Sequence, residues 1–119
     1  MFNKSPKWIS EIPVEREREA LTRLAHASRH GLEDPREMNF ELLDIKPGEI
    51  INAIVDLIEK AGWSCETGPD GDKDDRIALR AIKKDYVLTR HTYLRDFVFF
   101  NRIAKMYGCT YAGWFASNN

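Results

Sequence analysis

The sequence predicts a single α+β domain in which helices cover one side of a small antiparallel sheet. Three observations predict this class. The chain has 119 residues, which is within the size range of one domain, and its 43% hydrophobic and 31% charged content is an ordinary globular balance. Apolar residues recur near a period of 3.6 in some segments and near a period of 2 in others. Glycine and proline signals separate these segments, so the elements can be assigned in order.

The first 31 residues are expected to hold a lead-in and one helix. Residues 1–12 show no regular period, so we expect an irregular lead-in there. Residues 13–31 begin with Pro13, which is favoured in the first turn of a helix, and end at Gly31, a typical stop. Leu21, Leu24 and Ala25 form a narrow apolar stripe on this otherwise charged helix, which should therefore lie on the surface of the domain.

Residues 36–113 are expected to form the core of the domain. Residues 38–42 alternate apolar and polar side chains after the Asp34-Pro35 turn, which is typical of a strand with one wet face. Residues 49–62 (EIINAIVDLIEKAG) are the most hydrophobic segment and predict the main core helix.

The second half of this core is expected to contain a hairpin, a helix and a last strand. WSCET and RIALRAIKKDYVL read as two strands, and GPDGDKDD between them reads as a polar loop longer than a two-residue turn. Residues 90–107 have a helical period that ends at Gly108, and residues 109–114 read as a short strand.

The resulting order is one extra N-terminal helix followed by β-α-β-β-α-β, which is the order of a ferredoxin-like sandwich. Right-handed crossovers place the first and third strands in the centre of a four-stranded antiparallel sheet and the second and fourth at its edges. Cys65 and Cys109 then lie on opposite edges, so we expect no intramolecular disulfide, and reduced thiols in a cytoplasmic protein.

The chain ends in YGCTYAGWFASNN, which is unusually rich in aromatic residues. A last strand would place Tyr111 and Cys109 on one side of the sheet, and a turn at Gly113 would let Trp114 fold back over the sheet or the first helix. Two interpretations stay open for Tyr111 and Trp114. They either seal the edge of the core or form part of an exposed patch that binds a partner.

The acidic stretch around the predicted hairpin also has two interpretations. Asp70, Asp72, Asp74 and Asp75 form either a solvated loop or a surface that contacts a partner protein. A calcium loop of the EF-hand type is excluded, because the position that needs a glutamate is Ala81. His26 and His30 stand four residues apart on the first helix, but the zinc-protease pattern needs a Glu where Ala27 stands. We therefore expect no metal and no cofactor.

Basic residues gather late in the chain and could form a phosphate-binding stripe or simply an exposed helix face. They are Lys83, Lys84, Arg95, Arg102 and Lys105. The formal net charge of −1 gives no attraction of the whole molecule to nucleic acid.

No glycine-rich phosphate loop, nucleophile elbow or paired nucleophile and base is present, so we expect no catalytic residues and no enzyme. No apolar run is long enough to predict a membrane span.

Three segments, RHGLEDPREMNFEL, KAGWSCE and RIAKMYGCTYAGW, resemble the regulator of ribonuclease activity B family, whose members inhibit ribonuclease E. Ala112 stands where the family's Tyr-Asp-Gly-Trp ending has its acidic residue, and the acidic C-terminal tail of some members is missing. The resemblance implies a non-catalytic regulator of RNA degradation that binds a ribonuclease E-type endoribonuclease and not nucleic acid directly. The alternative is a ferredoxin-like module that binds RNA or a small ligand through its basic last helix.

Overall fold

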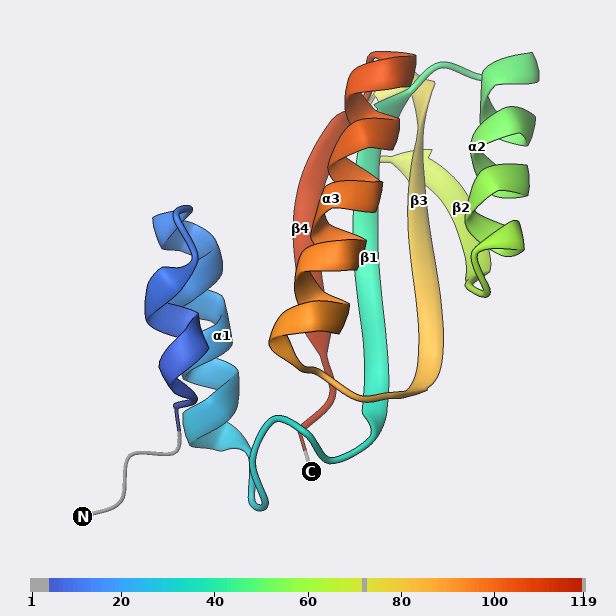
Figure 1. The fold of residues 1–119 in the computed structure, drawn as a ribbon. Coiled ribbons are helices and arrows are strands. Elements are labelled where there is room, and N and C mark those ends of the chain that lie inside the picture. Colours follow the sequence, from blue (N-terminus) through green and yellow to red (C-terminus); the bar gives the residue numbers. More distant parts are fainter. Residues whose placement is uncertain (1–4, 72, 119) are drawn as a thin grey trace.

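The computed structural model describes residues 5–71 and 73–118, apart from the side chain of Asp74, and has a mixed α+β fold (Figure 1). Within these residues, no helix combines the length and the apolar character that crossing a membrane requires. The elements, of which η1 is a 3-10 helix, are η1 (Lys7–Glu11), α1 (Glu15–Ala27), β1 (Arg36–Ile45), α2 (Glu49–Lys60), β2 (Ser64–Asp70), β3 (Lys73–Tyr86), α3 (Arg90–Tyr107) and β4 (Thr110–Ala116).

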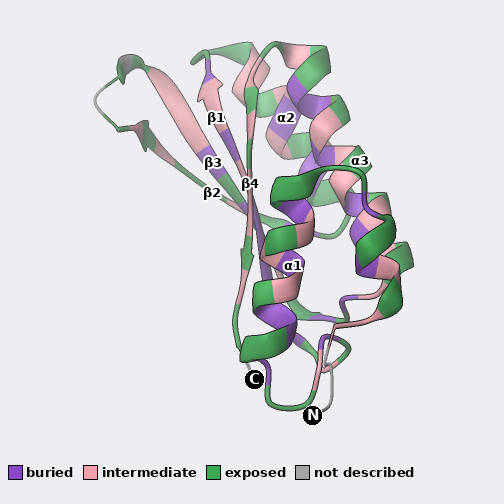
Figure 2. Cartoon of the chain, turned by 90° about the vertical axis from the view of Figure 1, so that its left-hand side faces the viewer, coloured by how far each residue is buried: buried purple, intermediate pink, exposed green. Residues whose placement is uncertain are grey.

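The four strands form one antiparallel sheet in the order β2-β3-β1-β4, so β1 and β3 are central and β2 and β4 are the edges. Helices α2 and α3 lie on the same face of this sheet (Figure 2). Alternate residues of the central strands point under these helices. Phe40 pairs with Ala81 and Leu42 with Leu79, and all four are buried.

Aromatic rings fill the space between the sheet and the two helices. The Phe40 ring stacks on Phe100 of α3, with 4.5 Å between the ring centroids. Trp63, which follows α2, meets both rings edge-on, at 5.5 Å from Phe40 and 5.2 Å from Phe100. This cluster joins β1, α3 and the end of α2, and its offset and edge-to-face geometries are the favoured ones.

The irregular lead-in expected over residues 1–12 is wrong in part. Residues 7–11 form η1, and Ile9 and Ile12 are buried, while residues 1–4 lie outside the description. The ring centroid of Trp8 lies 6.1 Å from that of Tyr93 in α3, so this segment packs on the body of the domain. The apolar period that identifies a helix of three or more turns is too short to be recognised in five residues.

Helix α1 covers fewer residues than the predicted 13–31. It ends at Ala27, where Ser28 turns to an extended conformation and its hydroxyl donates a 2.6 Å hydrogen bond to the Leu24 carbonyl. The Arg36 guanidinium, 4% exposed, donates to the Ser28 hydroxyl at 2.9 Å and to the Gly31 carbonyl at 2.6 Å. The first residue of β1 therefore holds residues 28–31 away from the helix.

The β2–β3 hairpin is longer and its turn is shorter than predicted. Most of GPDGDKDD lies in the strands, because β2 runs to Asp70 and β3 begins at Lys73, so the strands are separated by residues 71 and 72 alone. Asp70 pairs with Lys73 across the end of the hairpin. The prediction of residues 90–107 as a helix is confirmed, since α3 begins at Arg90 and ends at Tyr107 before Gly108, whose φ is 67°.

Candidate functional site

Within the described residues, the face of the sheet opposite α2 and α3 carries no helix (Figure 2). Because neighbouring residues of a strand point to opposite faces, the residues between the buried ones lie here. The register places Glu41 opposite Arg80 and Asn39 opposite both Ile82 and Phe115. We call this surface the open face and define it by Glu37, Asn39, Glu41, Leu43, Ser64, Glu66, Gly68, Ala78, Arg80, Ile82, Lys84, Gly113 and Phe115.

The centre of the open face is a contact between an arginine and an aromatic ring. The Arg80 guanidinium carbon lies 4.9 Å from the centroid of the Phe115 ring, which means that the side chain reaches from β3 across β1 to β4. Arg80 also lies 3.8 Å from the Glu41 carboxylate. Asn39, below them in β1, is 3% exposed, and its amide nitrogen lies 3.4 Å from the Phe115 carbonyl. Phe115 remains 41% exposed.

Two hollows border this centre. One, of about 220 Å³, lies beside Arg80 where Gly68 has no side chain to fill it, and a Cβ atom at Gly68 would meet nothing within 4 Å. The other, of about 580 Å³, lies between the start of β2 and Lys84. Glu66 lines both hollows. The open face therefore presents one ring, one stacked guanidinium and carboxylates around shallow depressions.

The predicted acidic residues of the hairpin differ in their environments. The Asp70 carboxylate accepts a 2.8 Å hydrogen bond from the backbone N–H of Asp44, so this side chain holds the end of β1 against the hairpin. Asp75 is exposed and pairs with Arg76 at 2.8 Å. Asp72 and the side chain of Asp74 lie outside the description. Of the four aspartates predicted to contact a partner, Asp75 is exposed, whereas Asp70 holds the end of β1 against the hairpin.

Asp44, the residue that Asp70 holds, has an unusual backbone conformation. Its φ of 60° is in the left-handed region, which non-glycine residues rarely adopt. Lys73 holds the Asp44 carboxylate with a 2.7 Å contact, and the hydrogen bond from this ammonium lowers the pKa of Asp44. Thr110 donates a further hydrogen bond of 3.3 Å to the same carboxylate. The end of β1 is therefore fixed by polar contacts to both β3 and β4.

Tyr111 and Trp114 both lie on the side of the sheet that the helices cover. Regular alternation along a strand would instead place residues three positions apart on opposite faces. Leu42 pairs with Tyr111 and Glu41 with Gly113, so β4 contains one extra residue, Ala112, at a bulge. Gly113 has a φ of 119°, and β4 continues to Ala116 without the predicted turn. The extra residue changes the alternation, which brings side chains three positions apart to the same face.

The contacts of these two aromatic residues are internal. The Tyr111 ring lies 5.6 Å from Phe97, and its hydroxyl donates to Glu17 at 3.2 Å. The Trp114 ring lies 6.5 Å from Tyr93, and its buried Nε1 has no hydrogen-bond partner among the described residues. These placements agree with the interpretation that they seal the core edge. The aromatic residue of this segment that faces outward is Phe115.

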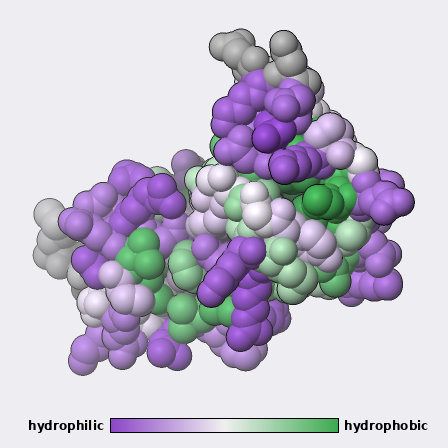
Figure 3. Space-filling view, turned by 90° about the horizontal axis from the view of Figure 1, so that it is seen from above, coloured by the Kyte–Doolittle hydropathy of each residue, from purple (hydrophilic) through white to green (hydrophobic). Residues whose placement is uncertain are grey.

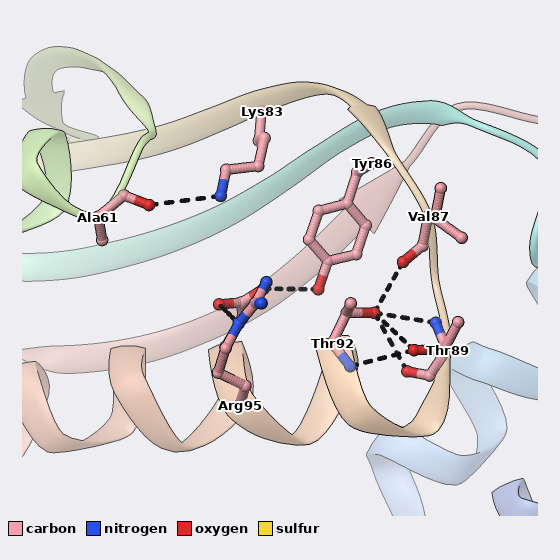
Figure 4. Close-up of polar contacts among 8 residues, drawn as sticks. Ala61, Lys83, Tyr86, Val87, Thr89, Thr92 and Arg95 are labelled. Carbon is pink, nitrogen blue, oxygen red and sulfur yellow. Dashed lines mark hydrogen bonds and ion pairs between the residues drawn. The ribbon is translucent and has the colours of Figure 1, made fainter.

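The predicted basic residues do not share one surface. Lys84 lies on the open face, whereas the Lys83 ammonium lies 4.8 Å above the Trp63 ring and 3.4 Å from the Ala61 carbonyl at the end of α2 (Figure 4). Arg102 and Lys105 are exposed on α3 and have no ion-pair partner in the part of the chain that the structure describes.

Arg95 has a structural partner as well. Its guanidinium donates to the carboxylate of Asp96 at 3.1 and 3.0 Å, and Tyr86 donates to the same carboxylate at 2.7 Å (Figure 4). Burial, and then the hydrogen bond to Asp96, raise the pKa of Tyr86. Thr89 and Thr92 form a capping box beside this group, which fixes where α3 begins.

A larger hollow, of about 760 Å³, lies between η1 and α1. It is lined by charges of both signs, including Lys7, Glu15, Glu19 and Arg23. Arg18 crosses this region and donates a 2.8 Å hydrogen bond to the Ile12 carbonyl, which ties the two helices together.

The residues that make the open face distinctive, Arg80 and Phe115, were not singled out from the sequence. The alternation of RIALRAIKK could have placed Arg80 on the face of the sheet away from Leu79 and Ala81. Phe115, by contrast, faces outward only because of the bulge in β4. Within residues 5–71 and 73–118, no three His, Cys, Asp or Glu side chains are grouped so that they could hold a metal ion. The sequence matches no known protein-family model and no curated protein.

Proposed function

We propose that this chain is a non-catalytic regulatory protein that binds another protein through the open face, and that the partner is a ribonuclease E-type endoribonuclease. The observation that carries the binding surface is the half-exposed Phe115 ring with Arg80 stacked on it. Aromatic and arginine side chains supply most of the binding energy at protein interfaces, and here both are held in place before a partner arrives. The resemblance in sequence supports the choice of partner.

The architecture supports the same proposal. The strand order β2-β3-β1-β4 and the succession of elements from β1 to β4 support a ferredoxin-like sandwich as the proposed topology, with α1 as an added N-terminal helix. Such a sheet leaves one face free for a partner. Since unrelated functions share this architecture, the proposal depends on the residues of the open face.

The charges of the open face favour protein over nucleic acid. Its carboxylates, on Glu37, Glu41 and Glu66, repel phosphate, and they outnumber the cations of Arg80 and Lys84. Single-stranded nucleic acid needs a basic groove and free ring faces on which bases stack. Phe115 is the one aromatic residue of the open face as defined above, and Arg80 already lies over it.

The same charges suit a basic partner surface. The hairpin beside the open face adds the exposed carboxylate of Asp75. Complementary potentials accelerate association and select the orientation of docking. A positively charged region of an endoribonuclease would meet both the hairpin and the three glutamates of the open face.

The alternative, binding of RNA or a small ligand through α3, has less support. Arg95 is paired with Asp96, and Arg90 lies 3.6 Å from Glu11. This leaves Arg102 and Lys105 as unpaired cations of α3, which is a small electrostatic contribution for binding a polyanion.

The test is direct binding and cleavage with purified components. We expect the chain to bind a ribonuclease E-type enzyme and to slow its cleavage of an RNA substrate, while a labelled RNA oligonucleotide alone stays unbound. Phe115→Ala and Glu66→Lys should each weaken binding roughly tenfold or more. Glu33→Lys is the matched control, because it makes the same charge change at an exposed loop position away from the open face.

Two results would overturn the proposal. Binding that is unchanged in both open-face variants would assign the interface elsewhere. Binding of the RNA oligonucleotide that disappears at high salt and in Arg102→Ala would favour the alternative.

A further inference from the structure

Helices α2 and α3 present opposite charges side by side on the helix-covered face of the sheet. The exposed acidic residues of α2 are Glu49, Asp56 and Glu59, and its one basic residue, Lys60, is already paired with Asp56 at 2.9 Å. The outer surface of α3 is the reverse. Its exposed charged residues are Arg90, Arg95, Arg102 and Lys105, of which Arg102 and Lys105 have no ion-pair partner among the described residues, and its one acidic residue, Asp96, is 4% exposed.

The two helices are antiparallel neighbours. Figure 1 shows α2 running from the upper end of the sheet downward and α3 running upward. This direction follows from the topology, because α2 joins β1 to β2 and α3 joins β3 to β4, and the strands of each pair run the same way. The outer surface of this layer is thus divided along its length into an acidic and a basic half.

Hydrophobic side chains are exposed between and beside these charges. Val98 of α3 is 41% exposed and Met106 is 66% exposed, the largest value among the exposed large hydrophobic residues of the described chain. Leu57 of α2 and Phe99 of α3 are only partly buried. Figure 3, which views the molecule from above and so along α2 and α3, shows hydrophobic side chains among the hydrophilic ones at this end of the domain. Exposed apolar side chains rimmed by charge are typical of a protein interface.

We infer that this helical layer is the docking surface for a second copy of the chain. A two-fold axis parallel to the helices and above the line between them places α2 of one copy against α3 of the other. The acidic half then meets the partner's basic half, and each contact occurs twice, as in any isologous interface. Glu49, at the start of α2, comes near the level of Arg102 and Lys105 at the end of the partner's α3.

The charges select this occupant over others. RNA or an acidic protein segment would be attracted to α3 but repelled by Asp56 and Glu59 of α2. A basic segment would be attracted to α2 but repelled by the cations of α3. A second copy satisfies both halves at once. The dimer leaves the open face of each copy uncovered, so the inference does not depend on the function proposed above.

Charge reversal and mixing test the dimer without any other partner. The first variant is Glu49→Lys, which sets a positive charge against the partner's Arg102 and Lys105, and the second is Arg102→Glu with Lys105→Glu, which sets negative charges against the partner's Glu49. We expect the wild-type chain to sediment as a dimer at low salt, and each variant to show a dissociation constant raised roughly tenfold or more. An equimolar mixture of the two variants should associate again, because each variant's altered helix then faces a complementary helix.

The mixture separates the inference from simple loss of folding, since misfolded variants would not recover, and circular dichroism of each variant checks the helices directly. A wild-type chain that stays monomeric at low salt and high concentration overturns the inference. So does a wild-type dimer that both variants retain, or a mixture that stays monomeric. An RNA oligonucleotide that binds the wild-type chain and not the second variant would identify a different occupant.

Discussion

The hydroxyl of Tyr93 in α3 donates a 2.6 Å hydrogen bond to the carboxylate of Glu17 in α1. Tyr111 of β4 donates to the same carboxylate oxygen at 3.2 Å, and Glu17 is only 2% exposed. A buried carboxylate is costly unless it accepts hydrogen bonds. This group therefore decides how α1 docks on the domain, together with the apolar side chains of Leu21 and Ala25, which share its helix face.

Removing the shorter of these bonds should loosen α1. Tyr93→Phe is expected to lower the free energy of unfolding by about 2 kcal/mol, because a buried charged acceptor loses its best donor. Tyr111→Phe should cost less, since its bond is longer. Urea denaturation followed by fluorescence measures both. Tyr107→Phe is the control, because Tyr107 is partly buried and its hydroxyl makes no hydrogen bond to any residue that the structure describes. A cost for Tyr107→Phe equal to that of Tyr93→Phe would contradict this role of Glu17.

Alkaline pH should unfold the protein through its buried tyrosines. Burial raises the pKa of Tyr86, Tyr93 and Tyr111, and the neighbouring carboxylates raise it further. In the unfolded chain these hydroxyls titrate near pH 10, so the folded state keeps protons that the unfolded state releases. The contribution is thus fully present below about pH 10 and is lost as the pH rises above it.

The measurement is the free energy of unfolding at several pH values between 8 and 11, together with tyrosinate absorbance. We expect three of the four tyrosines to ionise only when the chain unfolds or the pH is very high. Tyr93→Phe should make the decrease with pH less steep. Free ionisation of all tyrosines near pH 10 in the folded protein would refute the prediction.

The bulge in β4 should depend on the glycine at position 113. Its φ of 119° is strained for any residue with a Cβ atom, although the space around it is open. Gly113→Ala is therefore expected to lower the free energy of unfolding by about 1 to 2 kcal/mol, and thermal denaturation would measure this. Gly68→Ala in β2 is the matched control, because its position is equally open and its φ is not in this region. Equal effects of the two substitutions would mean that strain at the bulge is unimportant.

The thiols should be unreactive and unpaired. Cys65 lies on edge strand β2, Cys109 directly precedes β4 at the other edge, and both are free, as the strand order predicts. Burial, assisted by Glu59, raises the pKa of Cys65 to about 11, so little thiolate forms at pH 8. In a Cys109→Ser variant, a thiol reagent should react slowly at pH 8 and much faster in denaturant. Rapid reaction of the folded variant would show that Cys65 is not protected.

The sequence predicted elements well where their signals are local. The bounds of α3 follow from its apolar period and from Gly108, both of which belong to the helix itself. Prediction failed where distant residues decide. Nothing local in GPDGDKDD favours a strand, but pairing with β3 and the hydrogen bond between Asp70 and Asp44 extend β2 to the turn.

The candidate site shows the same division. The segment that ends in Trp114 and Phe115 was identified from its aromatic content, but which ring faces outward depends on the bulge opposite Glu41 and Leu42 of β1. Arg80 acquires its role only because the sheet brings Phe115 within reach across another strand. The proposed partner is an expectation from sequence resemblance, and the structure adds a surface on which it can be tested.

By itself the sequence determined the kind of each main element and the order in which they follow, because periodicity, glycine and proline act on neighbouring residues. The tertiary structure alone decided which charged side chains are buried, as Glu17 and Asp96 are, and which ring of the last strand faces solvent. Those outcomes depend on partners far away in the chain, and the free energy of a buried or exposed group is set by what surrounds it.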